Sequence, residues 1–193
     1  GWKKVTKVTY MWADPARYPM SSIVYTLLDG QHAVEVLMSH QIEKNIDQYP
    51  VMVVPEWEYI EPEILERLKL YVKDGGNLIV IGAESTRLFD DILGVTDKKD
   101  VFSSSLFLGY DDRMVQIGTN YRSVECSDQV KSFAKVYSAS DFRFPAGIAA
   151  TITNYGKGKI AGVYADISKT PISPVIRDFL SGILMEVFPE YMV

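Results

Sequence analysis

The stretch from residue 49 to residue 94 restricts the possible folds of this chain more than any other, because it reads as strand, helix, strand with each boundary marked. Val51–Val54 is a β-branched run followed by proline, which is typical of a strand buried on both faces. A helix is expected to begin at Pro62 and to end at Gly75 and Gly76, and residues 78–81 supply a second buried strand. The stretch therefore predicts a right-handed crossover unit of a parallel sheet, and an α/β fold.

The rest of the chain is expected to add strands and helices around this unit. Residues 7–12 predict a first strand and residues 23–28 a helix. We assign residues 33–38 to a strand, since Gly30 interrupts the helical pattern before them. Later apolar segments with turn residues between them predict antiparallel or edge strands at 105–108, 114–117, 133–137, 148–153 and 160–164. A hairpin turn over residues 154–158 and a closing helix over 172–188 complete the expected fold.

Composition limits the functional classes. With 193 residues, 47% of them hydrophobic, the chain is long enough for a single α/β domain with a sizeable core. The net charge of -5 and the scattered lysines and arginines argue against nucleic-acid binding. No apolar run approaches the ~18 residues that span a bilayer, so membrane insertion is not expected. Gly1 is typical of a residue left by tag removal, so we expect the true start, with any export signal, to have been removed, which leaves the compartment open.

Two stretches resemble a known family. Residues 25–85, with two glycines before a buried strand, and residues 145–167, with the hairpin Tyr155-Gly156-Lys157-Gly158, look like a class I glutamine amidotransferase-like domain. Such domains occur as the trimerisation domain of some β-galactosidases and as accessory domains of other bacterial glycoside hydrolases. The resemblance covers most of the chain. It implies that residues 1–193 form a single accessory domain, and it slightly favours a periplasmic or secreted location.

The same resemblance implies a particular architecture. The expected fold is a flavodoxin-like three-layer sandwich with a mostly parallel central sheet and with additional antiparallel or edge strands in the second half. Domains of this kind are usually attached to a catalytic barrel.

The residues that would carry amidotransferase chemistry are missing. The amidotransferases proper place a cysteine at a tight turn after the strand that matches residues 78–81, and they pair it with a later histidine and glutamate. Here the turn reads Gly82-Ala83-Glu84-Ser85, a degenerate nucleophile elbow, and both histidines, His32 and His40, precede it. We therefore expect no catalytic residue and no enzyme activity of this chain.

Other reactive side chains have simpler interpretations. Cys126, the single cysteine, is more often a small core residue than a nucleophile. Ser85 lies outside any G-x-S-x-G pattern, and Ser85 or Thr86 is interpreted as the N-cap of a short helix over residues 87–93. No spacing of His, Asp or Glu matches a metal motif, so neither a metal nor a cofactor is expected.

Polar residues that follow the predicted strands form one candidate ligand site, because open parallel sheets bind ligands beyond the carboxyl ends of their strands. These residues are Asp14, Arg17, His40, Glu56, Trp57 and Glu84. Carboxylates accept hydrogen bonds from sugar hydroxyls, an indole stacks on a pyranose ring, and a carboxylate pair can hydrolyse a glycosidic bond. The favoured alternative is that the polar residues cap helices or meet solvent, and that Trp57 and Tyr59 cover the core or an interface.

Together these observations favour a non-catalytic accessory domain of a carbohydrate-active enzyme. Its expected partners are a catalytic domain of the same polypeptide or further copies of itself. Two alternatives stay open: a carbohydrate-binding or small-ligand module that uses the strand-end cleft, and a hydrolase that uses a carboxylate pair.

Overall fold

The computed structural model describes residues 8–12, 21–57, 59–98, 102, 105–118 and 120–189. Nine strands form one sheet in the order β2-β1-β3-β4-β11-β10-β9-β6-β7. The strands of its parallel half are β1 (Val8–Trp12), β2 (Val34–Met38), β3 (Val51–Val54), β4 (Asn77–Ile81) and β11 (Gly158–Val163). The strands of its antiparallel half are β6 (Leu106–Tyr110), β7 (Arg113–Ile117), β9 (Lys131–Tyr137) and β10 (Pro145–Tyr155).

The sheet is mixed. Four of its eight strand pairings are parallel and four are antiparallel. The α/β class is therefore confirmed, whereas the expectation of a mostly parallel flavodoxin-like sheet is not. The sequence indicated the late strands, but it did not indicate how many of the strand pairings would be antiparallel, because pairing depends on contacts between distant segments.

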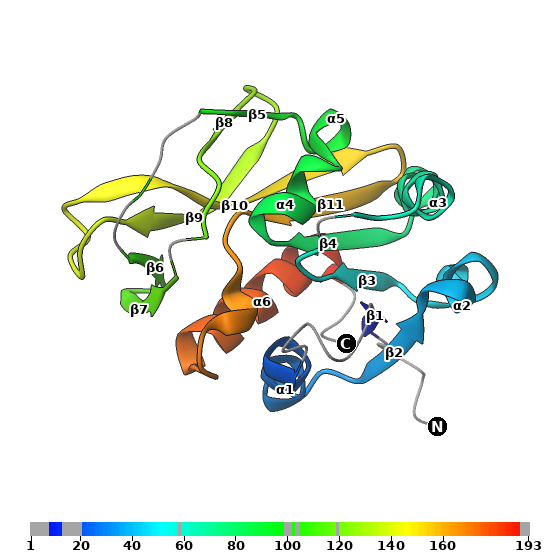
Figure 1. Cartoon of the computed structure of the whole chain (residues 1–193), viewed down its shortest axis with the longest axis horizontal. Coiled ribbons are helices and arrows are strands. Elements are labelled where there is room, and N and C mark those ends of the chain that lie inside the picture. Colours follow the sequence, from blue (N-terminus) through cyan, green and yellow to red (C-terminus); the bar gives the residue numbers. More distant parts are fainter. Residues whose placement is uncertain are drawn as a thin grey trace.

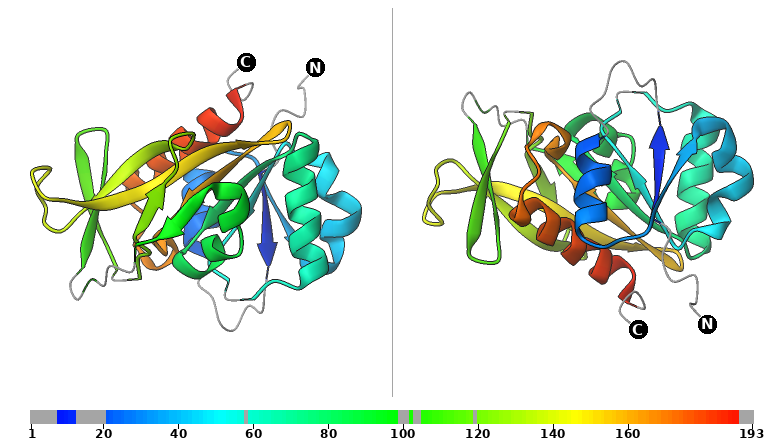
Figure 2. Two further views of the ribbon diagram at one scale, coloured as in Figure 1. Left: turned by 90° about the horizontal axis from the view of Figure 1, so that it is seen from above. Right: turned by 90° about the horizontal axis from the view of Figure 1, so that it is seen from below.

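Helices cover both faces of the parallel half (Figure 1). One face carries α1 (Ser21–Asp29) and α6 (Pro174–Val187), which pack on each other, and Figure 2 shows them from below. On the other face lie α3 (Pro62–Asp74), α4 (Ala83–Arg87) and α5 (Asp90–Leu93), with α2 (Ser39–Asn45) beside α3. Short 3-10 turns, η1 (Ile46–Gln48) and η2 (Ile167–Lys169), follow α2 and precede α6.

The predicted crossover unit forms as the sequence indicates. Every residue of β3 and β4 is buried, and the two strands pair in parallel. Pro62 begins α3, where its missing N–H costs nothing, and Gly75 ends the helix with a φ of 123° that favours glycine. Its amide N–H donates to Val72 O at 3.1 Å, which satisfies one of the last helical carbonyls.

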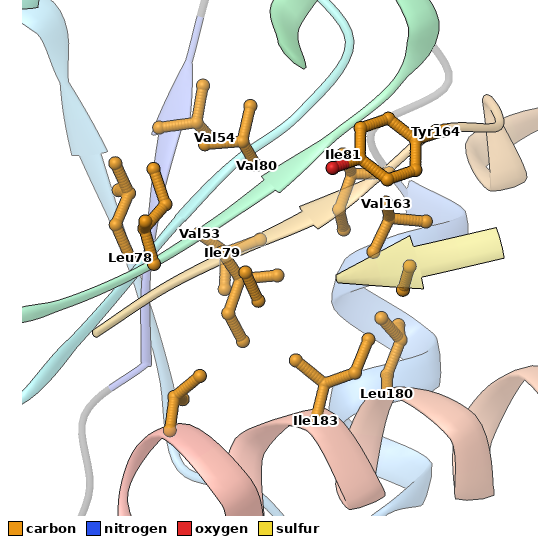
Figure 3. Packing of buried hydrophobic residues seen from close by; sticks show 14 of the residues in the cluster. Val53, Val54, Leu78, Ile79, Val80, Ile81, Val163, Tyr164, Leu180 and Ile183 are labelled. Atoms are coloured by element: carbon orange, nitrogen blue, oxygen red, sulfur yellow. The ribbon is translucent and has the colours of Figure 1, made fainter. Parts of the chain in front are cut away.

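Side chains from both faces of the crossover unit enter the core (Figure 3). Val53 and Ile79 point toward Leu180 and Ile183 of α6, while Val54 and Val80 point to the opposite face. This alternation follows from the two-residue period of a strand, and the parallel register pairs Val53 with Ile79. The same strands therefore supply core residues to both helical layers, which explains their continuous apolar composition.

The later hairpin also agrees with the prediction. Tyr155 pairs with Gly158, so residues 156 and 157 form a two-residue turn between β10 and β11. The turn abuts the end of α3: a Cβ at Gly156 would lie 2.4 Å from Lys73 O, and the Lys157 amide donates to that oxygen at 3.0 Å. Glycine is required at this position because of the close approach.

Some expectations need correction. The expected short helix over residues 87–93 is two separate turns, α4 and α5, and Ser85 and Thr86 lie inside α4 rather than at an N-cap. The pattern did not predict α2, or the two-stranded sheet of β5 (Val95–Asp97) and β8 (Val124–Cys126). In the part of the chain that the structure describes, no helix is long and apolar enough to cross a membrane.

Candidate functional site

The candidate site lies where β3 and β4 end and α4 begins. Glu56 follows β3 by two residues, and its half-buried carboxylate reaches the first turn of α4. The backbone N–H groups of Glu84 and Ser85 donate to this carboxylate at 3.2 and 3.3 Å, and Asn120 Nδ2 donates to Oε1 at 3.2 Å. Glu56 therefore joins the loop after β3, the start of α4 and the segment before β8.

Gly82 forms the tight turn that leads into α4. Its φ of 119° and ψ of 157° lie in a region that is accessible essentially to glycine alone. A Cβ on Gly82 would lie only 1.7 Å from Glu56 Oε2. The carboxylate thus fills the space directly above the turn, at the place where the resemblance expected a nucleophile.

Two opposing influences act on the Glu56 carboxyl group. Burial raises its pKa above the ordinary value, and the negative charge of Asp166 adds to this effect. The hydrogen bonds from Glu84, Ser85 and Asn120 act in the other direction, but the net shift is upward. Asp166 itself is buried and caps η2 by accepting a hydrogen bond from the Ser168 amide at 3.1 Å.

Ser85 is fully buried, and its hydroxyl is committed to the backbone of the loop after β3. It donates to Pro55 O at 2.6 Å and lies 3.1 Å from Trp57 O, and it accepts a hydrogen bond from the Trp57 amide. This hydroxyl ties α4 to that loop. It has neither the exposure nor the base that a nucleophile requires.

The structure brings some of the predicted site residues together and separates others. Glu56, Trp57 and Glu84 meet at the start of α4, but the Trp57 side chain packs against the core and the Glu84 carboxylate faces Arg87 at 3.4 Å. His40 is exposed on α2 and lines a hollow between α2 and α3. Asp14 and Arg17 lie outside the residues that the structure describes.

Sequence reasoning missed Asn120 and Asp166. Asp166 follows β11 by three residues. The expectation that polar residues beyond the carboxyl ends of parallel strands form the ligand site, which selected Glu56, could therefore also have selected Asp166. Asn120 precedes β8 in an irregular segment, and no sequence signal connects it with Glu56. Among the described residues, no group of three or more His, Cys, Asp or Glu side chains is arranged to hold a metal ion.

Cys126 lies at the end of β8 and is half-buried. Burial raises the pKa of its thiol, which lowers the thiolate fraction at neutral pH. Both histidines precede it in the sequence, and its strand partner is Val95. These properties are those of a packed thiol rather than an activated one.

Comparisons with known proteins identify the fold but not a family. No family model matches the sequence, and no curated protein matches it significantly. Solved structures do match. Gan42B, a GH42 β-galactosidase from G. stearothermophilus, aligns with a TM-score of 0.69 at 14% identity over 94% of this chain. A cold-adapted β-galactosidase from Rahnella sp. R3 gives a TM-score of 0.68 at 14% identity, also over 94% of this chain.

This chain spans only 30% and 31% of those two β-galactosidase chains. A cytoplasmic protein from Salmonella typhimurium LT2 also matches, with a TM-score of 0.66 at 13% identity, and there the alignment covers 94% of this chain and 99% of that one. The expected resemblance to a β-galactosidase domain is thus confirmed at the level of the fold.

Proposed function

We propose that residues 1–193 form a single non-catalytic, glutamine amidotransferase-like accessory domain of a carbohydrate-active enzyme. The domain packs on a catalytic domain of the same polypeptide or on copies of itself. One observation carries this proposal: the Glu56 carboxylate fills the turn at Gly82 where a nucleophile would act. The order of the parallel strands, β2-β1-β3-β4-β11, also fits a flavodoxin-like sheet.

The closed turn removes the usual means of stabilising an oxyanion. Acyl transfer needs backbone N–H groups that point at a developing negative charge. The N–H groups of Glu84 and Ser85 would be the donors at this turn, and both already donate to Glu56. A substrate carbonyl would have to displace a half-buried carboxylate that also accepts from Asn120. The arrangement therefore supports a structural role for a turn that serves catalysis in related folds.

The two alternatives have less support. A sugar-binding cleft needs an aromatic platform, but Trp57 packs against the core. A hydrolytic carboxylate pair needs two carboxyl groups that face a common substrate. Here Glu56 holds the start of α4, Asp166 is buried as the cap of η2, and Glu84 faces Arg87. The location of the matched segment within longer glycoside hydrolases fits an accessory role better.

Activity assays test the non-catalytic part of the proposal. We expect no glutaminase or glycosidase turnover from the wild-type chain, and none from Glu56→Ala, which would open the turn at Gly82. Ser85→Ala removes the neighbouring hydroxyl and tests whether any turnover depends on it. Turnover that is present in the wild type and lost in Glu56→Gln or Ser85→Ala would refute the proposal.

Binding and assembly are tested separately. Calorimetric titration with galactosides and fucosides should give no heat, whereas heat that depends on Trp57 would favour the sugar-binding module. Sedimentation at several protein concentrations shows whether the chain self-associates or is a monomer on its own. Adding the purified catalytic domain of the parent polypeptide should then produce a complex if the chain is monomeric.

A further inference from the structure

Two shallow hollows lie along the outer side of α3 and meet at Arg67 and Leu70, which line both. We call the combined depression the α3 trough. The first hollow, of about 690 Å³, lies between α2 and the first half of α3. The second, of about 840 Å³, lies between η1 and the end of α3 and extends to Phe188. Figure 1 shows α2 and α3 side by side at one end of the sheet.

The trough has an apolar floor. Ile42 and Ile64 line the first hollow, and Tyr71 and Phe188 line the second. Leu70 stands between them with 48% of its surface exposed, although it lies on a helix whose opposite side is fully buried. An exposed leucine on its own needs no explanation, but one that stands between a mainly apolar hollow and a mixed polar and apolar hollow marks a surface able to bury a partner.

The rim of the trough is strongly acidic. Five carboxylates line the two hollows, against the single guanidinium of Arg67; they belong to Glu43, Asp47, Glu63, Glu66 and Asp74. Arg67 pairs with Asp47 at 2.5 Å. Glu43, Glu63 and Asp74 form no ion pair with any other residue that the structure describes, so most of the negative charge along the trough is uncompensated.

The length of the trough favours a helical occupant. It follows α3, whose 13 residues correspond to about 20 Å of helix. A third helix laid between α2 and α3 at the usual interaxial distance of about 8–10 Å would cover Leu70 and place its flanks near both acidic rims. The charge also selects the class of partner, because anionic lipid and nucleic acid would be repelled.

We propose that the α3 trough binds an amphipathic helix of a partner polypeptide, with an apolar stripe flanked by lysine or arginine. The proposal rests on the accessory role proposed above and gives it a docking surface. Apolar side chains of the helix contact Leu70 and the floor of the two hollows. Its basic residues pair with Glu43, Glu63 and Asp74 along the rim, which makes binding sensitive to salt.

The test uses a synthetic peptide as the probe. It is a helical Leu/Lys peptide of about 14 residues, matched in length to α3, with leucines at helical spacing and a fluorescent label. A second peptide carries glutamate in place of every lysine. We expect saturable binding of the basic peptide to the 193-residue chain, weakened at about 0.5 M salt, and no binding of the acidic peptide.

Matched variants locate the binding surface. Leu70→Ser should weaken binding about tenfold or more, whereas Met185→Ser, which changes a comparably exposed residue of α6, should leave it unchanged. Glu43→Gln combined with Glu63→Gln should weaken binding several-fold at low salt and little at high salt. Glu125→Gln, at the exposed middle residue of β8, is the charge control. Amide chemical shifts should change along α2 and α3.

Several results would overturn the inference. They are no binding of the basic peptide, equal loss of binding in the control variants, or chemical-shift changes that lie away from α2 and α3. Concentration-dependent self-association that Leu70→Ser abolishes would identify a second copy of the chain as the occupant instead. None of these results depends on the glutaminase and glycosidase assays, so the non-catalytic proposal stands or falls separately.

Discussion

Arg122 should be one of the most sensitive positions for stability outside the apolar core. Its side chain is only 1% exposed, and its guanidinium donates to Asp97, to Asp90 at 2.6 Å and to the Thr86 hydroxyl at 3.4 Å. The residue therefore connects β5, α5 and α4 through one buried group. Replacing it with alanine removes all of these contacts and leaves a cavity.

The size of the effect follows from the exposure of the partners. Breaking a buried ion pair costs about 3–5 kcal/mol when the remaining charge stays buried. Asp90 and Asp97 are 39% and 31% exposed, so water can solvate them after the change, and Asp97 keeps its contact with Arg87. We therefore expect Arg122→Ala to lower the free energy of unfolding by about 3 kcal/mol, at the lower end of that range.

The same network supplies a matched control. Arg87 pairs with the same carboxylate, but its side chain is 42% exposed. Arg87→Ala should cost no more than about 1 kcal/mol, as surface ion pairs do. Arg122→Lys keeps the charge but loses the planar guanidinium that binds two carboxylates. Its loss of stability should therefore lie between the losses of Arg87→Ala and Arg122→Ala.

Urea unfolding followed by circular dichroism measures these differences. Thermal unfolding should show a decrease in Tm of about 6–12 °C for Arg122→Ala, since 1 kcal/mol corresponds to about 2–4 °C in a chain of this size. A loss of stability in Arg122→Ala that is no greater than the loss in Arg87→Ala would refute the reasoning.

The pH dependence gives a second check. Burial alone would raise the pKa of Asp97, but the hydrogen bonds and charges of Arg122 and Arg87 hold it below the ordinary value. A carboxyl group with a lowered pKa in the folded state stabilises the fold above its unfolded pKa of about 3.9, and this stabilisation disappears as the pH falls through the folded value. The difference in the free energy of unfolding between the wild type and Arg122→Ala should thus stay constant near neutral pH and become smaller below about pH 4.

Three further predictions concern the turn at Gly82 and the single thiol. Because the pKa of Glu56 is raised in the folded state, the wild type should lose stability relative to Glu56→Gln as the pH rises above the ordinary value of 4.5. Urea unfolding of both variants from acid to neutral pH checks this. A difference in the free energy of unfolding that does not change with pH would contradict it. Gly82→Ala should lower the free energy of unfolding by about 3 kcal/mol or more, through backbone strain and the clash with Glu56. Because Glu56→Ala removes the clash, the double variant should lose at least about 1 kcal/mol less than the sum of the two single variants. Simple additivity would show that the clash is unimportant. Because burial raises its pKa, the Cys126 thiol should react with Ellman's reagent at least about tenfold more slowly in the folded chain than in urea, and equal rates would argue against a packed thiol.

The parts of the fold that the sequence predicted are those with local signals. The β3–α3–β4 unit has a β-branched run, a proline at the first helical turn and a glycine pair, and each feature acts within a few residues. The short elements were missed because their signals are weak. Helix α2 has a single buried residue, Ile42, and β5 and β8 are three-residue strands that pair across almost thirty residues of sequence.

The candidate site shows the same distinction. The position of Glu56 and Glu84 at neighbouring strand ends followed from the topology of parallel sheets. What Glu56 does there did not, because its role depends on Asn120 and on the absence of a side chain at Gly82. The orientation of Trp57 toward the core also depends on tertiary packing, which a run of residue types does not specify.

The long strand β10 has a consequence for anyone who wishes to divide or rebuild this chain. It pairs with β11 along one edge and with β9 along the other, so a single strand belongs to both halves of the sheet. Fragments that end between β9 and β10 would each expose a full row of unpaired backbone groups, and we expect them to aggregate. The exposed two-residue turn at Asp111 and Asp112, which joins β6 to β7, is the better position for a fusion or for new chain ends.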